Sequence, residues 1–288
     1  MTNQIGIMSG RLSPPFNGKI QSFPTNTWKS EFKKASSCGF EVIEWVFDSI
    51  EKNPILDDNG IKEIKSLSEE NQIQVKSVCA DFFMDNHLFN VSEFNLERNL
   101  QILTNLITNC QKLEIKILEI PFLESSSINN QNYQNQVISN LQKILPLAHD
   151  NDVKLTLETD LNPKSFRDLL LQFNNENIAA NYDIGNSTSN GFEIKTELEI
   201  LFPWIANIHI KDRLLHDHTV PLGTGDVNFE SFFSIISKLN YNEDFIIQGA
   251  REDLENTKID PETTCEKYLK FVMKYTNKYL NEINGNNV

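Results

Sequence analysis

Seven residues that can bind a metal or exchange a proton lie at the ends of short apolar runs in this sequence. They are Glu44, Asp81, Glu119, Glu158, Asp183, His209 and Gln248. Successive members are 37, 38, 39, 25, 26 and 39 residues apart, and each separation fits one strand–helix–strand unit. Buried carboxylates are costly unless they are paired, hydrogen-bonded or bound to a metal. Two carboxylates with a neutral imidazole suit Mn²⁺, Mg²⁺, Co²⁺ or Zn²⁺, whereas separate salt bridges to lysine or arginine are the alternative.

The elements that must position these residues are eight short apolar runs, which alternate with longer amphipathic segments. The runs span residues 4–8, 42–46, 74–79, 115–120, 153–158, 178–183, 205–210 and 244–248. Eight strand–helix units predict an α/β fold, a single (β/α)8 TIM barrel over residues 1–288, with residues 281–288 as a polar, frayed tail. In such a barrel the carboxyl ends of the strands form the site, so the polar residues are expected to meet there.

A doubly wound open sheet is the alternative fold. Dinucleotide-binding sheets of that kind carry a Gly-rich phosphate-binding turn after the first strand. No GxGxxG motif follows any predicted strand, and the first strand leads into residues 9–15, SGRLSPP, which are too proline-rich to begin a phosphate-binding helix. The barrel is therefore favoured.

Composition narrows the classes of function. The chain has 288 residues, a net charge of -14 and a pI of about 4.8, which disfavours general binding to phosphate backbones. The four cysteines are far apart and form no CxxC pair, so we expect them to be reduced. We expect no signal peptide, because no basic region followed by a long apolar run stands near residue 1, and the sequence has no apolar stretch of about 18 residues. We therefore expect a cytoplasmic protein that binds neither nucleic acid nor membranes.

Five short motifs carry a resemblance to a known family. They are residues 39–44 (GFEVIE), 157–158 (LE), 182–186 (YDIGN), 209–212 (HIKD) and 220–229 (VPLGTGDVNF). In this order and spacing, which covers nearly the whole chain, the sequence resembles the xylose isomerase-like TIM barrels, specifically their sugar-phosphate isomerase/epimerase group. Its better-known members are L-ribulose- or L-xylulose-5-phosphate 3-epimerases and ketose 3-epimerases.

The resemblance implies one divalent metal ion and assigns its ligands. Three of the family's ligands fall on Glu158, Asp183 and His209, and the fourth, a glutamate in the family, falls on Gln248. In the epimerases the two glutamates also act as opposed bases on the carbon next to the carbonyl. A glutamine can offer its amide oxygen to a metal but cannot take up a proton at neutral pH.

Glu158 is therefore the candidate catalytic base. A single base on one face of the substrate can shuttle a proton between adjacent carbons, as in aldose–ketose isomerisation. Two alternatives stay open. Glu252, four residues after Gln248, could supply the second carboxylate, or the barrel could have lost its chemistry and only bind a ligand.

Several further residues are candidates for contact with the substrate. Asn186 falls where several family members have a substrate-contacting histidine. Glu44 could bind sugar hydroxyls or could instead be a hydrogen-bonded carboxylate inside the barrel, and Asp81 is a further candidate for substrate binding. Four cations just beyond strand ends could bind a phosphate or carboxylate, or could instead neutralise nearby acids. These cations are Arg11, Lys211, Arg213 and Arg251.

The most metal-like short cluster is residues 216–218, HDH. The related endonuclease IV enzymes use such residues for zinc, but the register differs here and the further histidines that those enzymes need are absent. We expect this segment to be a loop over the site, and endonuclease IV-like activity is disfavoured.

These observations predict a divalent-metal-dependent isomerase or epimerase whose partner is a small sugar or sugar phosphate. The resemblance also implies that the chain could form a homodimer or homotetramer. Two other classes stay open: a catalytically reduced sugar-binding barrel, and a metal-dependent hydrolase or lyase that acts on a modified sugar.

Overall fold

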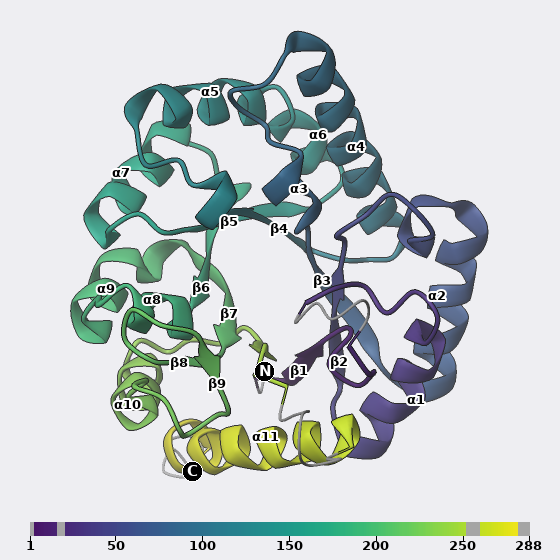
Figure 1. The fold of residues 1–288 in the computed structure, drawn as a ribbon, viewed down its shortest axis with the longest axis vertical. Coiled ribbons are helices and arrows are strands. Elements are labelled where there is room, and N and C mark those ends of the chain that lie inside the picture. Colours follow the sequence, from purple (N-terminus) through teal and green to yellow (C-terminus); the bar gives the residue numbers. More distant parts are fainter. Residues whose placement is uncertain (1–2, 16–20, 252–259, 282–288) are drawn as a thin grey trace.

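Eight parallel strands close into a barrel with helices around its outside, as the sequence predicts (Figure 1). The computed structural model describes residues 3–15, 21–251 and 260–281. Around the barrel the strands follow the order β1-β10-β7-β6-β5-β4-β3-β2. They are β1 (Ile5–Met8), β2 (Val42–Val46), β3 (Gln74–Cys79), β4 (Ile117–Phe122), β5 (Lys154–Thr159), β6 (Ile178–Asp183), β7 (Ile205–Ile210) and β10 (Phe245–Ile247).

The helices connect successive strands and lie outside the ring. They are α1 (Trp28–Cys38), α2 (Asp58–Asn71), α3 (Phe82–Asp85), α4 (Glu93–Lys112), α5 (Gln131–Gln142), α6 (Leu145–Asp150), α7 (Pro163–Phe173), α8 (Ile184–Ser189), α9 (Ile194–Leu201), α10 (Phe229–Lys238) and α11 (Pro261–Thr276). A two-stranded hairpin, β8 (Asp212–Arg213) with β9 (Thr219–Val220), follows β7. No helix within the described ranges is long and apolar enough to cross a membrane.

Local signals in the sequence account for where these elements begin and end. The side chain of Asp57 accepts hydrogen bonds from the backbone N–H groups of Asn59 and Gly60, which caps the start of α2. Asn228 caps α10 in the same way through the N–H of Ser231. Helix α1 ends at Gly39, whose φ of 92° is the left-handed conformation that glycine adopts without strain.

Two regions of side chains fill the molecule on either side of the sheet. Between the strands and the outer helices lies an apolar core in which Trp45 packs against Trp28 and Phe23. Inside the barrel, alternation along each strand points a second set of side chains toward the axis. This inner set is unusually polar. Strand pairing places Asp183 beside His209 and Glu44 beside Ser77.

Candidate metal and substrate site

His209, on β7, lies between two pairs of carboxylates and is fully buried. On one side of its ring, Nδ1 lies 3.5 Å from Glu158 Oε2 and 4.0 Å from Asp183 Oδ2. On the other side, Nε2 lies 2.7 Å from Glu44 Oε1 and 3.3 Å from Glu119 Oε2. The ends of β5, β6 and β7 thus bring together three of the four residues predicted as metal ligands.

The donor atoms of Glu158, Asp183 and His209 fit a divalent cation. One atom from each lies within 4.8 Å of the others, and all three residues are buried. A cation with bonds of about 2.1–2.4 Å could contact all of them. Lys211 Nζ lies 3.0 Å from Asp183 Oδ2, so a positive charge already borders this cluster.

Gln248 directly follows β10 and has a buried acceptor on the inner side of the barrel. Its backbone N–H donates to Ile210 O at 3.0 Å, which continues the pairing of β10 with β7. Ile246 is paired with His209, and alternation turns Gln248 to the same inner side. The amide Nε2 of Gln248 donates to Gln21 Oε1 at 3.0 Å. Its Oε1 is buried and has no hydrogen-bond partner among the described residues, as suits a metal ligand.

The charges in this cluster favour a cation as well. Burial alone would raise the pKa of Glu158, but hydrogen bonding to His209 and the charges of His209 and Lys211 lower it to about 2, so Glu158 is ionised at neutral pH. Burial would lower the pKa of His209, but the neighbouring Glu44 and Glu119 raise it well above its ordinary value. Burial raises the pKa of Glu119. These opposing shifts arise because several carboxyl groups surround one imidazole and one ammonium group, and a divalent ion would offset the negative charge that remains.

Asn186, at the start of α8, contacts the catalytic candidate directly. Its Nδ2 donates to Glu158 Oε1 at 2.5 Å, and its Oδ1 accepts from Arg213 Nη1 at 2.9 Å. Asn181, two residues before Asp183 on the same face of β6, donates to Glu158 Oε2 at 2.7 Å. Both oxygens of Glu158 are therefore held by amides. The sequence predicts a substrate contact for Asn186, and this stays a prediction. Asn181 was not predicted, although its position two residues before Asp183 places both side chains on the same face of the strand.

Glu44 lies deeper in the barrel than a substrate contact would. It is 0% exposed, and besides His209 it contacts Ser77 Oγ at 2.6 Å and Asn207 Nδ2 at 2.9 Å. These hydrogen bonds agree with the alternative prediction of a hydrogen-bonded carboxylate inside the barrel, and the contact with sugar hydroxyls stays a prediction.

Asp81, just beyond β3, is joined to Gln248 through one intermediate residue. Gln21 Nε2 donates to Asp81 Oδ2 at 2.6 Å, and Gln21 Oε1 accepts from both Gln248 and Arg11. Burial raises the pKa of Asp81 to about 6. Sequence reasoning missed Gln21, because it lies in the loop after β1 and no strand end marks it.

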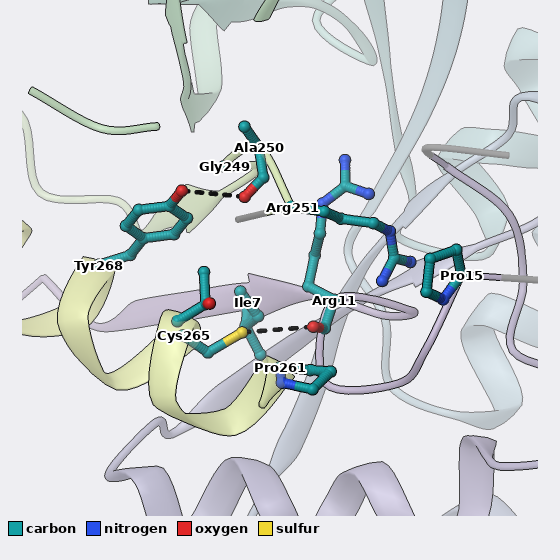
Figure 2. Close-up of a pocket in the computed structure, with 10 residues that line it drawn as sticks. Ile7, Arg11, Pro15, Gly249, Ala250, Arg251, Pro261, Cys265 and Tyr268 are labelled. Atoms are coloured by element: carbon teal, nitrogen blue, oxygen red, sulfur yellow. Dashed lines mark hydrogen bonds between the residues drawn. The ribbon is translucent and has the colours of Figure 1, made fainter. Parts of the chain in front are cut away.

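The four candidate anion-binding cations form two groups. Lys211 and Arg213 lie beside Asn186. Arg11 and Arg251 lie beyond β1 and β10 and line a cavity of about 30 Å³, which is far smaller than a sugar site (Figure 2). Arg251 donates to Ser13 O at 2.6 Å and to Gly10 O at 2.7 Å, and so fastens the loop after β1. Burial and the charge of Arg251 lower the pKa of Arg11 to about 10, which leaves it protonated at neutral pH.

The Gly-rich segment after β9 is tied to Asp212, whose side chain is fully buried. Asp212 accepts from the backbone N–H groups of Gly223 at 2.8 Å, Gly225 at 2.9 Å and Val227 at 3.2 Å. The HIKD aspartate and the Gly-x-Gly loop therefore form one structural unit. They account for part of the resemblance without touching the metal cluster.

Residues 216–218 form the exposed turn of the β8–β9 hairpin. Arg213 donates from Nε and Nη2 to Asp217 O, and the N–H of His216 donates to Ser189 O. Neither His216 nor His218 belongs to a candidate metal cluster of the described residues. The predicted role of this turn as a loop over the site stays a prediction. Glu252, the alternative second carboxylate, lies outside the described residues.

With this geometry established, comparison with known proteins identifies the class. Residues 32–272 match the family described as xylose isomerase-like TIM barrel, and the chain belongs to that family. It is 24% identical over 250 residues to SgbU of Haemophilus influenzae, provisionally named an L-ribulose-5-phosphate 3-epimerase, with 79% of this chain and 86% of the relative covered. The Escherichia coli K12 protein of the same name is 22% identical over 240 residues and is covered to 83%, with 77% of this chain.

Solved structures of sugar epimerases share the fold. An L-ribulose 3-epimerase matches with a TM-score of 0.79 at 15% identity, over 100% of this chain and 99% of that one. A D-psicose 3-epimerase from Clostridium cellulolyticum H10 matches with a TM-score of 0.74 at 13% identity, over 94% of this chain and 99% of that one. At these identities the similarity establishes the barrel architecture.

Proposed function

We propose that the protein is a divalent-metal-dependent isomerase or epimerase of a sugar or sugar phosphate. The observation that carries the proposal is the cluster of Glu158, Asp183 and His209 at adjoining strand ends, with the unpartnered Oε1 of Gln248 on the next strand. The curated relatives, which are named for L-ribulose-5-phosphate 3-epimerase activity, point to the same class of substrate. A bound Mn²⁺, Mg²⁺, Co²⁺ or Zn²⁺ would supply Lewis acidity at the substrate carbonyl.

Glu158 is the residue of this chain best placed to accept a proton. It is ionised at neutral pH, and Asn186 and Asn181 fix the orientation of its carboxylate. It would accept the proton from the carbon next to the carbonyl and return it to the same or the adjacent carbon. The low pKa that keeps Glu158 ionised also makes it a weak base, so proton transfer depends on acidification of the substrate at this site.

The remaining predicted residues would orient the substrate. Lys211 and Arg213 flank Asn186 and could bind an anionic or hydroxyl group there, while Arg11 and Asp81 meet at Gln21 on the opposite part of the rim. Arg251 would act mainly by fastening the loop that carries Arg11. We place the enzyme in the cytoplasm, as a homodimer or homotetramer.

Solvent deuterium exchange tests the proposal. Chelator-treated protein is incubated in D₂O with a panel of ketoses and ketose phosphates, with and without Mn²⁺. We expect deuterium next to the carbonyl of at least one sugar only with Mn²⁺. The Glu158→Gln variant should lose this exchange and Glu199→Gln, an exposed glutamate on α9, should retain it. Exchange that does not need Mn²⁺ or Glu158 would contradict the proposal.

A sugar-binding barrel without chemistry is the second candidate, because Gln248 cannot act as a base. Calorimetric binding of a sugar without any deuterium exchange would favour it. Release of a fragment from a modified sugar would instead favour a hydrolase or lyase.

A further inference from the structure

The side-chain amide of Gln21 is hydrogen-bonded at both ends, at the mouth of the barrel where β1, β3 and β10 end. Its Oε1 accepts from Arg11 Nη2 and from Gln248 Nε2, each at 3.0 Å. Its Nε2 donates to Asp81 Oδ2 at 2.6 Å. Arginine has only donors and a carboxylate has only acceptors, so these partners fix which end of the amide faces which residue. Gln21 thus contacts three residues that the sequence predicts for the metal and the substrate.

The backbone beside Gln21 is held by contacts that the amide does not share. The N–H of Phe23 donates to Asp48 Oδ2 at 3.1 Å, and the buried ring of Phe23 packs against Trp45 with 5.0 Å between the ring centroids. The side chain of Gln21 is half-buried, and its Nε2 lies 3.9 Å from the sulfur of Cys79 at the end of β3. The amide can therefore leave its partners while the backbone that carries it stays in place.

The three hydrogen bonds define the chemical group that could take the place of this amide. That group must accept from Arg11 and Gln248 and must donate to Asp81. A hydroxyl group has one proton to donate and two lone pairs, so a sugar hydroxyl between these residues meets all three requirements. A phosphate group carries a charge of about −1.5 to −2 at pH 7. It would mostly lack a proton for Asp81, and the carboxylate would repel it.

We infer that the amide of Gln21 occupies the binding position of a substrate hydroxyl group and competes with the substrate for its three partners. The inference rests on the proposed function and adds the kind of group that this part of the site binds. It assigns the side of the mouth near Arg11 to a hydroxyl-bearing part of the substrate. An anionic group, in a substrate that has one, would then bind on the side of Lys211 and Arg213, which flank Asn186.

Titration calorimetry in the presence of Mn²⁺ tests the inference with L-ribulose, D-psicose, D-tagatose and L-ribulose 5-phosphate. Gln21→Ala removes the competing amide, so every ligand of this panel that binds the wild type should bind the variant roughly fivefold tighter. The reason is that a ligand reaches the wild-type site only in the fraction of molecules from which the amide has moved away. Gln21→Asn, whose amide is one methylene shorter, should show a similar gain. Gln172→Ala, on the exposed surface of α7, is the matched control and should bind as the wild type does.

Inorganic phosphate is the probe for the kind of group that binds beside Arg11. Its affinity for Gln21→Ala should not exceed its affinity for the wild type, because Asp81 accepts hydrogen bonds and repels anions. A gain with phosphate as large as the gain with a ketose would reveal an anion site and overturn the inference.

The outcomes separate this inference from the proposed function. Ketose binding that is unchanged or weaker in Gln21→Ala would overturn the inference, since the amide would then be a neutral or favourable contact. Failure of every sugar of the panel to bind either protein would overturn the proposed function. The side-chain amide resonance of Gln21 in glutamine-labelled wild type, assigned by its absence from the variants, should move when a ketose saturates the protein. An unmoved resonance would contradict the inference without recourse to the stability of any variant.

Discussion

Gln248 and Gln21 are joined side chain to side chain, with Nε2 of Gln248 3.0 Å from Oε1 of Gln21. Gln21 in turn donates a hydrogen bond from its Nε2 to Asp81 Oδ2, at 2.6 Å. Gln248, which follows β10, is thus oriented by an amide from the loop after β1, and its own Oε1 has no hydrogen-bond partner among the described residues. In the proposed metal site, a neutral ligand at this position would bind the cation more weakly than a carboxylate, and it would leave out one of the two bases that the family resemblance implies.

Gln248→Glu should therefore strengthen metal binding and add a base. A carboxylate in place of the amide oxygen should raise Mn²⁺ affinity by roughly tenfold, which corresponds to about 1.4 kcal/mol. If the wild type works with Glu158 as its one base, the second carboxylate of Gln248→Glu should return the proton on the opposite face. The variant should then form the epimer in the deuterium-exchange assay. Titration calorimetry and product analysis measure the two effects. Unchanged affinity would place residue 248 outside the ligand set, and Gln172→Glu, on the exposed surface of α7, is the control for added charge.

Much of this site could be predicted because a parallel barrel converts sequence order into spatial order. Glu158, Asp183 and His209 each occupy a strand end, and strand pairing in a closed sheet leaves little freedom in where those ends lie. The fold was predictable for the same reason, since eight apolar runs of strand length alternate with helical segments. Strands β2, β3, β6 and β7 have the predicted bounds, and the other four barrel strands differ by one or two residues, for example β4, which begins at Ile117 rather than at residue 115.

Contacts that depend on loop paths and rotamers could not be predicted. Gln21 reaches Asp81 across 60 residues of sequence, and nothing in the local pattern marks it. Glu44 was identified as a polar strand residue. Whether its side chain contacts the substrate or His209 depends on the depth of that side chain in the barrel, which the sequence does not give. Asp212 stands in a motif together with Lys211, yet one side chain holds a loop and the other borders the metal cluster.

Lys211→Met should increase the affinity for Mn²⁺. The ammonium group lies 3.0 Å from Asp183 Oδ2 and is mostly buried, so it repels a cation that shares that carboxylate. We expect roughly tenfold tighter binding, about 1.4 kcal/mol, together with weaker binding of an anionic substrate. Lys195→Met, which removes an exposed charge on α9, should leave Mn²⁺ binding unchanged. Weaker Mn²⁺ binding in Lys211→Met would contradict a competing role for the ammonium group.

Gly225→Ala should disrupt the loop that Asp212 organises. A Cβ at this position would lie 2.3 Å from Asp212 Oδ1 and 2.7 Å from Arg213 O, so the carboxylate would have to leave the backbone N–H groups that it binds. We expect a loss of about 2 kcal/mol or more in the free energy of unfolding, since buried hydrogen bonds to a charged group are lost. Gly39→Ala is the comparison. Its new Cβ would meet only Leu269, at 3.5 Å, and the cost of its positive φ should be about 1 kcal/mol. Urea denaturation that ranks the two variants in the opposite order would contradict this account.

Glu197→Gln should remove part of the pH dependence of stability. Glu197, on α9, is buried and accepts a hydrogen bond from the hydroxyl of Tyr182 at 3.1 Å, and burial raises its pKa from 4.5 to about 7. The folded protein therefore holds this proton more tightly than the unfolded chain does. The contribution of protonated Glu197 to the free energy of unfolding is fully present below about pH 4.5. It is lost as the pH rises through 7, and the total loss is about 3 kcal/mol.

The variant should accordingly match the wild type in urea denaturation at pH 5 and exceed it at pH 8. Burial raises the pKa of Glu31 to about 7 as well. The free energy of unfolding of the variant should therefore still fall between pH 5 and pH 8, but by less than that of the wild type. Glu199→Gln, which alters an exposed neighbour on the same helix, should follow the wild-type pH profile. Parallel pH profiles for Glu197→Gln and the wild type would show that Glu197 is not the group that titrates, because a glutamine at this position has no proton to lose.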